Sequence, residues 1–210
     1  KGQKRAKKRF HFFSPVFLLL KFLPVLRLVE TSKTLQHAAF TLLFMRIYKQ
    51  YDKDALDRQY NNLLNSPDQK VHLERWEILS REAEKKYAVS KNIPYGELPD
   101  EKLDIFPSQH PGSKTLSFIH GGYWYKHAAS DFYLVAEAFR SYGLTTVLID
   151  YPLRPAFPMD QLVVSCRRAI HWLQQNLAKY NGNPEQVYVS GHSAGAHLAA
   201  MMMATDWPQF

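Results

Sequence analysis

The sequence predicts an α/β protein with a mostly parallel sheet and helices on both of its faces. Short runs of β-branched and aromatic residues alternate with longer amphipathic runs between residues 102 and 203. The strand-like runs are apolar almost throughout, which is typical of parallel strands buried on both faces. The helical runs between them supply the crossover connections that parallel strands require.

Two helices are expected before the first strand. Residues 46–65 carry Leu and Tyr at helical spacing until Pro67, and residues 76–87 repeat this pattern. Both helices are expected to cover the core or the mouth of a site. Residues 93–99 contain Pro and Gly and are expected to form turns, whereas residues 102–107 alternate like a strand.

The remaining elements follow a regular strand and helix order. A strong strand is expected at residues 115–119, a helix at 130–142 and a second strong strand at 145–150. A Pro-rich loop covers residues 151–158, and an amphipathic helix is expected at 159–179. No internal repeat interrupts this order, so one α/β domain is expected.

The positive charge of the chain is confined to its first segment. The formal net charge is +8, but residues 1–44 hold nine of the 27 Lys and Arg residues and only one of the 19 acidic residues. Residues 45–210 are therefore neutral overall, which argues against a nucleic-acid-binding domain. The basic block and the apolar run after it resemble the charged and apolar regions of a signal peptide, but Lys and Pro interrupt the run and no small-x-small cleavage site follows. The run is also too broken for a membrane-spanning helix.

Two interpretations of this first segment stay open. It is a tail that associates weakly with membranes, or it is an upstream extension that precedes a native start at Met45. We take residues 1–44 as an extension outside the fold and residues 45–210 as the N-terminal portion of the folded domain. Expression from Met45 tests this division, because an insoluble shorter protein would contradict it.

Cysteine and histidine usage limits the chemistry. Cys166 is the only cysteine, so no intrachain disulfide and no Cys-x-x-Cys site can form. It lies on the apolar stripe of the helix expected at residues 159–179 and is expected to pack in the core. A lone thiol suits a reducing compartment, and we expect a cytoplasmic protein. The nine histidines show no metal-ligand spacing, so we expect no metal and no other cofactor.

A Gly-x-Ser-x-Gly motif at residues 191–195 carries the chemistry. A β-branched run leads into it and an Ala-, Leu- and Met-rich run follows, which predicts a strand, a sharp turn and a helix with Ser193 at the apex. Such a turn presents the hydroxyl for nucleophilic attack once a base removes its proton. Gly191 and Gly195 allow neighbouring backbone to pass close to the turn.

A His-Gly-Gly motif at residues 120–122 supplies a second part of the site. Attack by Ser193 creates a tetrahedral oxyanion, which needs N–H donors that already point at the developing charge. Ala194 is one candidate donor by its position after the serine. Gly121 and Gly122 are the others, because without side chains their backbone is open to a substrate.

The nearby histidines and Asp150 are expected to have supporting roles. His192 lies within the turn and His197 one helical turn beyond it, so neither is expected to reach the Ser193 hydroxyl as a base. His120 is expected to order its loop, because the base comes later in the chain order Ser, acid, His. Asp150 ends a strand and is expected to support a loop.

These motifs resemble those of the α/β-hydrolase superfamily, and more narrowly its kynurenine formamidase group beside the hormone-sensitive-lipase-like esterases. The resemblance rests on His-Gly-Gly-Tyr-Trp at residues 120–124, on the loop at 150–155 and on Gly-His-Ser-Ala-Gly-Ala-His at 191–197. It extends from about residue 48 to residue 207. The α/β-hydrolase fold is therefore the expected architecture.

The resemblance implies a role for each motif residue. Ser193 is the nucleophile, and the oxyanion donors are Gly121, Gly122 and Ala194. The residues implied to lie around the substrate pocket are His120, Tyr123, Trp124 and His192. The rings of Tyr123 and Trp124 either face an aromatic substrate or pack in the core or over the site.

The acid and the histidine of the implied triad are expected on later strands. Only 17 residues follow Ser193, and among them only Asp206 and His197 could take part in proton transfer. Neither is expected at the end of a further strand. We therefore expect the sequence to be C-terminally incomplete, to lack the last strands of the fold and to be nearly inactive by itself.

The activity implied by the resemblance is that of an arylformamidase in tryptophan catabolism. Such an enzyme hydrolyses N-formyl-kynurenine-like aryl formamides to formate and the free amine through an acyl-Ser193 intermediate. A carboxylesterase for small esters is one alternative. A non-catalytic chain that binds a ligand, a partner or a membrane is the other. The sequence does not indicate an oligomeric state.

Overall fold

The computed structural model describes residues 46–61 and 65–210. Our expectations for residues 1–44 and for a start at Met45 fall outside this range. The chain divides after Pro67 into two compact units, which are described separately.

The described part of the first unit contains helix α3, Lys53–Tyr60. A carboxylate oxygen of Asp52 caps it by accepting a hydrogen bond from the Ala55 N–H at 2.7 Å. The helix expected over residues 46–65 is therefore wrong at its start. An Asp that satisfies a free N–H of the first turn fixes the boundary more strongly than the apolar periodicity does.

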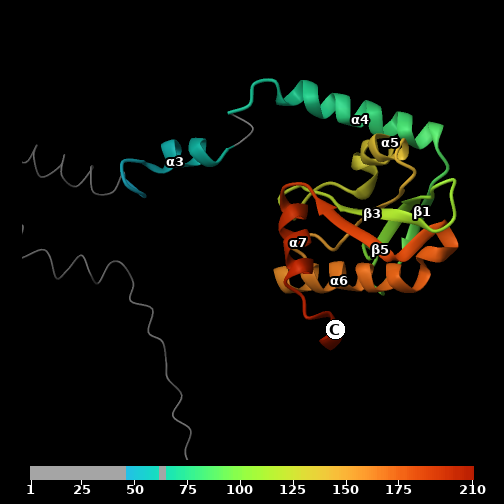
Figure 1. Ribbon diagram of the computed structural model, residues 1–210. Coiled ribbons are helices and arrows are strands. Elements are labelled where there is room, and N and C mark those ends of the chain that lie inside the picture. Colours follow the sequence, from blue (N-terminus) through green and yellow to red (C-terminus); the bar gives the residue numbers. More distant parts are fainter. Residues whose placement is uncertain (1–45, 62–64) are drawn as a thin grey trace, which may run out of the picture. The chain divides into compact units, whose positions relative to one another are not determined.

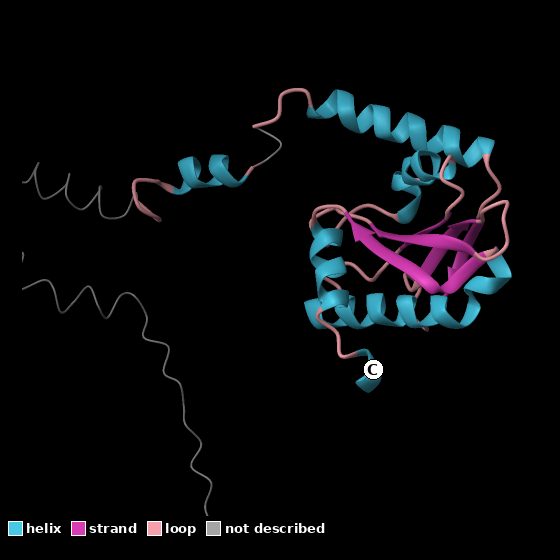
Figure 2. Ribbon diagram, viewed as in Figure 1, coloured by secondary structure: helices cyan, strands magenta, loops and turns pink. Residues whose placement is uncertain are grey.

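A five-stranded sheet forms the centre of the second unit (Figure 2). Its strands are β1 (Ser90–Pro94), β2 (Lys102–Phe106), β3 (Ser113–Ile119), β4 (Thr145–Ile149) and β5 (Gly182–Gly191). Their order is β1-β2-β4-β3-β5, with β2 antiparallel to both of its neighbours and with β4, β3 and β5 mutually parallel. Within this described sheet, β2 alone runs against the other strands, so the prediction of a mostly parallel sheet is confirmed.

Helices cover both faces of this sheet, as predicted. One face carries α4 (Gln69–Lys86), the 3₁₀ turn η1 (Ala129–Phe132) and α5 (Leu134–Arg140); the other carries α6 (Met159–Asn176) and α7 (Ala194–Met203). Figure 1 shows α4 and α5 on one side of the strands and α6 on the opposite side. Among the described residues, no helix has the length and the apolar character needed to cross a membrane.

The central strand β4 is buried along its whole length and feeds two cores. Val147 and Ile149 pack toward α6, whereas Leu148 packs toward α5, because successive side chains of a strand point to opposite faces. Cys166 lies on the buried stripe of α6 and is 0 % exposed, so its expected place in the core is confirmed. Burial raises the pKa of this thiol well above its usual value.

Two predicted boundaries are wrong for identifiable reasons. Residues 93–94 end strand β1 instead of opening a turn. A proline is tolerated there because β1 is an edge strand and Pro94 is its last residue. The helix expected over residues 130–142 begins as a 3₁₀ turn and becomes α-helical only at Leu134. Asp131 there accepts a hydrogen bond from the Ala128 N–H and so caps the 3₁₀ turn.

The register of the three parallel strands defines one edge of the sheet. Ile119 at the end of β3 pairs with Ile149 at the end of β4 and with Gly191 at the end of β5. The residues that follow each strand therefore leave the sheet at the same level. In α/β sheets this carboxyl edge is where ligands bind.

Candidate active site

Ser193 occupies the turn between the end of β5 and the start of α7. Its backbone has φ +52° and ψ −116°, and its side chain is exposed. For a residue with a Cβ, such a left-handed conformation costs about 1–3 kcal/mol and persists where surrounding contacts impose it. The Gly195 N–H holds the turn by donating to the His192 carbonyl at 2.8 Å.

Close backbone packing explains the two glycines of this motif. A Cβ on Gly195 would lie 2.0 Å from the Ile119 carbonyl oxygen, and a Cβ on Gly191 would lie 2.3 Å from the Gly195 carbonyl oxygen. Both distances are far below van der Waals contact. The turn around Ser193 can therefore sit directly on the end of β3 only because these positions lack side chains.

The loop after β3 lies against the same turn. A Cβ on Gly121 would come within 2.8 Å of the His192 imidazole and 3.3 Å of the Ser193 Cβ. Gly122 has φ +114°, which strongly favours glycine, and its carbonyl accepts hydrogen bonds from two N–H groups farther along the loop. Residues 120–122 and 191–195 thus meet in space, although 73 residues separate His120 from Ser193.

The predicted oxyanion donors have no acceptor among the described residues. Within the described part of the chain, neither Gly121 nor Gly122 donates its N–H to another residue. Ala194 opens α7, where the first N–H groups have no partner inside the helix. Gly121 packs directly against Ser193 and Ala194 follows it in the chain, so N–H groups without an acceptor lie close to this exposed serine, as stabilisation of an oxyanion would need.

His120 lies behind this loop, not in the pocket. It is 1 % exposed, its Nδ1–H donates to the Gly121 carbonyl at 2.7 Å, and its Nε2 lies 3.5 Å from a carboxylate oxygen of Asp150. The ring stacks on Tyr151 at 4.5 Å. Its expected place around the substrate pocket is therefore corrected, because burial and stacking keep it away from substrate. These contacts are those of a loop-ordering residue.

Asp150 supports the loops on the far side of His120. Its carboxylate accepts a hydrogen bond from the Ala129 N–H at 2.7 Å, and its carbonyl accepts one from the Tyr95 hydroxyl at 2.7 Å. Asp150 makes no hydrogen bond with Ser193. Its geometry fits the supporting role that the sequence suggested.

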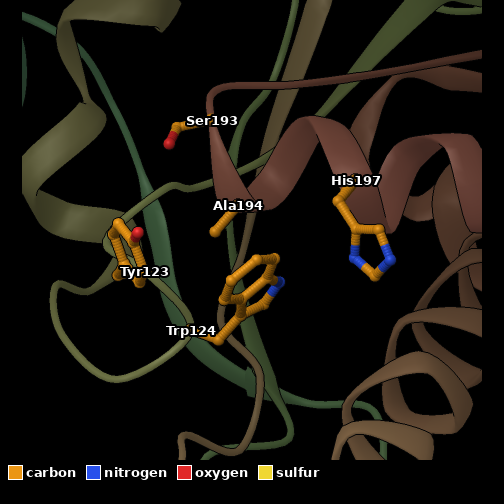
Figure 3. A pocket seen from close by; sticks show the side chains of 5 residues that line it. All are labelled: Tyr123, Trp124, Ser193, Ala194 and His197. Carbon is orange, nitrogen blue, oxygen red and sulfur yellow. The ribbon is translucent and has the colours of Figure 1, made fainter. Parts of the chain in front are cut away.

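An open pocket of about 350 Å³ adjoins Ser193 (Figure 3). The residues that line it are Tyr123, Trp124, Ser193, Ala194 and His197. Tyr123 and Trp124 both have positive φ, and the Arg154 N–H holds their loop by donating to the Trp124 carbonyl at 2.8 Å. The two aromatic rings expected near a substrate are thus brought to the serine.

His197 is a pocket residue that sequence reasoning did not assign to the pocket. It lies on α7 four residues after Ser193, and residues at this spacing share one face of a helix. That spacing was the available signal. Figure 3 shows its imidazole beside the Trp124 indole and turned away from the Ser193 hydroxyl. In this orientation His197 is not positioned to take the proton of that hydroxyl.

His192 faces a different part of the molecule from the pocket. Its exposed imidazole meets the Trp76 ring of α4 edge to face, with ring centroids 5.5 Å apart, and lies near Phe132. The sequence placed His192 around the pocket, but the pocket lining does not include it. Helix α4 thus contacts the residue before Ser193, but it contributes no residue to the pocket lining and packs over the core instead.

Two further observations define what the described residues offer chemically. None of them makes a hydrogen bond with the Ser193 hydroxyl, so no general base is paired with it there. No group of three or more His, Cys, Asp or Glu side chains in residues 46–61 and 65–210 could hold a metal ion.

A strained serine at a strand-to-helix turn, at the carboxyl edge of a parallel sheet, defines the α/β-hydrolase class. The chain belongs to the BD-FAE family, whose model matches residues 103–208. This match begins within β2 and includes the loop after β3, the turn around Ser193 and all of α7.

Relatives with assigned names agree with this class. The chain is 31 % identical to the kynurenine formamidase of Danio rerio over 174 residues, which cover 79 % of this chain and 58 % of that enzyme. It is 34 % identical to the esterase LipQ of Mycobacterium tuberculosis over 120 residues, which cover 54 % of this chain and 28 % of LipQ. The chain thus spans less than two thirds of the length of either relative.

A solved structure shares the fold. Esterase B of Lactobacillus rhamnosis superimposes with a TM-score of 0.53 at 16 % identity, over 67 % of this chain and 50 % of that chain. At this identity the likeness concerns the fold alone. It agrees with the α/β-hydrolase architecture expected from the sequence.

Proposed function

We propose that this protein is a serine hydrolase that removes the formyl group from small aryl formamides. The Ser193 oxygen attacks the formyl carbon and its proton passes to a general base, while the carbonyl oxygen becomes an oxyanion held by the N–H groups of Gly121, Gly122 and Ala194. The C–N bond breaks and the amine leaves with that proton. Water then hydrolyses the formyl ester to formate and regenerates Ser193.

The observation that carries this proposal is the set of three unsatisfied N–H groups beside an exposed, strained serine. Removing one such donor in a serine hydrolase costs about 100- to 1,000-fold in turnover. N–H groups left without an acceptor close to a nucleophilic serine match what acyl transfer needs.

The aromatic part of the proposed substrate is supported by the pocket. Tyr123 is 58 % exposed although it is a large ring, and it meets Trp124 edge to face with centroids 5.8 Å apart. An exposed aromatic ring beside a nucleophile suits a flat ligand. The similarity to kynurenine formamidase supports a formamide as the scissile group.

A carboxylesterase for small esters is the second candidate. It is supported by the similarity to the esterase LipQ and by the openness of the pocket next to Ser193 to a short acyl group. The same nucleophile and oxyanion donors serve ester and formamide hydrolysis. The two candidates therefore differ only in the leaving group.

Turnover of formanilide and of p-nitrophenyl acetate separates the candidates. The assays use the protein beside its Ser193→Ala variant as the control for background hydrolysis. Formanilide turnover that disappears in Ser193→Ala supports the formamidase. Strong ester turnover without formanilide turnover contradicts it and favours the esterase.

A further inference from the structure

The end of the pocket away from Ser193 contains two polar groups without hydrogen-bond partners. The Trp124 indole Nε1 is buried and has no acceptor. The exposed His197 imidazole makes no hydrogen bond with any residue in the described ranges. Its ring meets the Trp124 ring at 89°, with centroids 5.5 Å apart. Figure 3 shows the indole nitrogen turned toward His197 and away from the serine.

An unpaired buried N–H needs an explanation. Leaving such a group without an acceptor is unfavourable by about 1–3 kcal/mol, and most buried polar groups in folded proteins are paired. Four other side-chain atoms in the described residues are also buried without partners, but none of them belongs to a residue that lines the pocket. The Trp124 N–H is thus the one that a ligand in the pocket could satisfy.

We propose that Trp124 and His197 bind a second hydrogen-bond acceptor of the substrate, a carbonyl or carboxylate oxygen on its aromatic ring. The inference rests on the proposed function, in which the formyl oxygen already occupies the N–H groups near Ser193. An indole is a donor only, and a neutral imidazole donates from one nitrogen. Two donors at one end of a mostly apolar pocket select an acceptor in that position.

Because the Trp124 Nε1 is buried and lies on the side of the indole that faces His197, we infer that a ligand reaches it when the His197 ring turns. Exposed side chains change rotamer within nanoseconds, and none of the residues that the structure describes makes a hydrogen bond with this imidazole. A ligand oxygen that enters beside Trp124 can therefore displace the ring and accept from both groups. Helix α7 fixes the Cα of His197 relative to Ser193, which fixes the distance between the acceptor and the scissile bond.

The test compares aryl formamides that differ only in the ring substituent. The probes are 2-acetylformanilide and 2-isopropylformanilide, which have similar shapes, and N-formylanthranilate, which carries a carboxylate. Dissociation constants are measured by NMR on the ¹⁵N-labelled chain, whose four tryptophans give four indole N–H signals. The Trp124→Phe variant assigns the signal of Trp124.

We expect 2-acetylformanilide to bind about five- to tenfold more tightly than the isopropyl analogue, as one net hydrogen bond predicts. The Trp124 indole proton should shift downfield with the acetyl ligand only. The His197→Phe variant should lose most of the preference, whereas His171→Phe, which changes an exposed histidine of α6, should keep it. Tighter binding of N-formylanthranilate would identify a carboxylate as the preferred acceptor.

Equal affinities for the acetyl and isopropyl ligands, or a Trp124 signal that does not respond, would overturn the inference. The phenyl acetate esters with the same two substituents distinguish this failure from failure of the proposed function. If the acetyl preference persists in both series but only the esters are hydrolysed, the acceptor site stands and the formamidase proposal falls.

Discussion

Two buried carboxylates beside the sheet respond to their surroundings in opposite directions. Burial raises the pKa of Asp104, although it accepts hydrogen bonds from the Tyr133 hydroxyl and the Asn92 N–H. Burial also acts to raise the pKa of Glu101, but hydrogen bonds from Ser165 and the Leu98 N–H and a 3.0 Å ion pair with Arg168 outweigh it and lower that pKa. The number of charged and polar partners decides the sign.

These opposite shifts predict opposite pH dependences. Asp104 has a raised pKa, so its contribution to stability is present below its unfolded pKa and is lost as pH rises through the folded value. Asp104→Asn should therefore gain stability relative to the parent chain as pH rises above about 4. The measurement is the free energy of unfolding in urea at several pH values.

Glu101→Gln provides the matched comparison. Because the pKa of Glu101 is lowered, its contribution is present above its unfolded pKa and is lost as pH falls through the folded value. The free energy of unfolding of Glu101→Gln should lie below that of the parent chain at neutral pH, and the difference should shrink as pH falls below about 4.5. If the stabilities of the two variants relative to the parent chain changed in the same direction with pH, at least one of the two assignments would be wrong.

Gly195 should not tolerate even one methyl group. Gly195→Ala places a Cβ against the backbone of β3, so we expect a loss of about 1–3 kcal/mol in the free energy of unfolding. Ala196→Ser, at the exposed neighbouring position, should stay within about 0.5 kcal/mol of the parent chain. Urea denaturation measures both, and equal stabilities would show that the turn can move away from β3.

At the scale of elements, α4 depends on one face for its attachment. Ser80 donates to the Asp131 carbonyl and accepts from the Leu134 N–H, which ties α4 to η1 and α5. Trp76 packs against Phe132 and His192. Ile78 on the same helix is 56 % exposed and contributes little to the packing of α4 on the rest of the second unit. The half of α4 near Ser193 is therefore held chiefly by one aromatic ring.

Trp76→Ala should loosen α4 without unfolding the sheet. We expect a loss of about 2–3 kcal/mol in unfolding free energy, below the range for a fully buried aromatic residue because Trp76 is half-buried. Amide hydrogen exchange should speed up in α4 more than in β4. Ile78→Ala is the control and should leave both measurements close to those of the parent chain.

The elements with strong local patterns were predictable from the sequence. Strand β4 is wholly apolar or β-branched, and α6 repeats apolar residues at helical spacing, so both were placed within a few residues. Strand β1 was missed because it has five residues, only one of them β-branched, and ends at Pro94. It forms because β2 offers a free edge, which is tertiary information.

At the scale of the whole molecule, the sequence predicted the motifs of the site but not all of their neighbours. The glycines of Gly-x-Ser-x-Gly and His-Gly-Gly allow backbone conformations and close packing that few other residues tolerate. The contact between the two motifs could therefore be predicted. The contact between Trp76 and His192 depends on how α4 lies across the sheet. The burial of His120 depends on stacking with Tyr151. Neither contact can be predicted from the local sequence.

No residue in the described part of the chain makes a hydrogen bond with the Ser193 hydroxyl, which predicts slow turnover that an added base can raise. Exogenous imidazole should increase p-nitrophenyl acetate hydrolysis by the 210-residue chain beyond the rate seen with Ser193→Ala, because it can take the serine proton in solution. The difference between the two proteins, measured against imidazole concentration, isolates this effect. Identical slopes would mean that Ser193 is not positioned to react.

The three parallel strands end at the same level, at Ile119, Ile149 and Gly191. The two edges of the sheet therefore differ in how freely their loops can change in evolution. Every reactive loop described above leaves from the carboxyl edge. The turn at residues 141–143 leads into β4 at the opposite edge. Insertions there could lengthen the chain, add a binding module or change its surface while the distance between the serine and its oxyanion donors stayed the same.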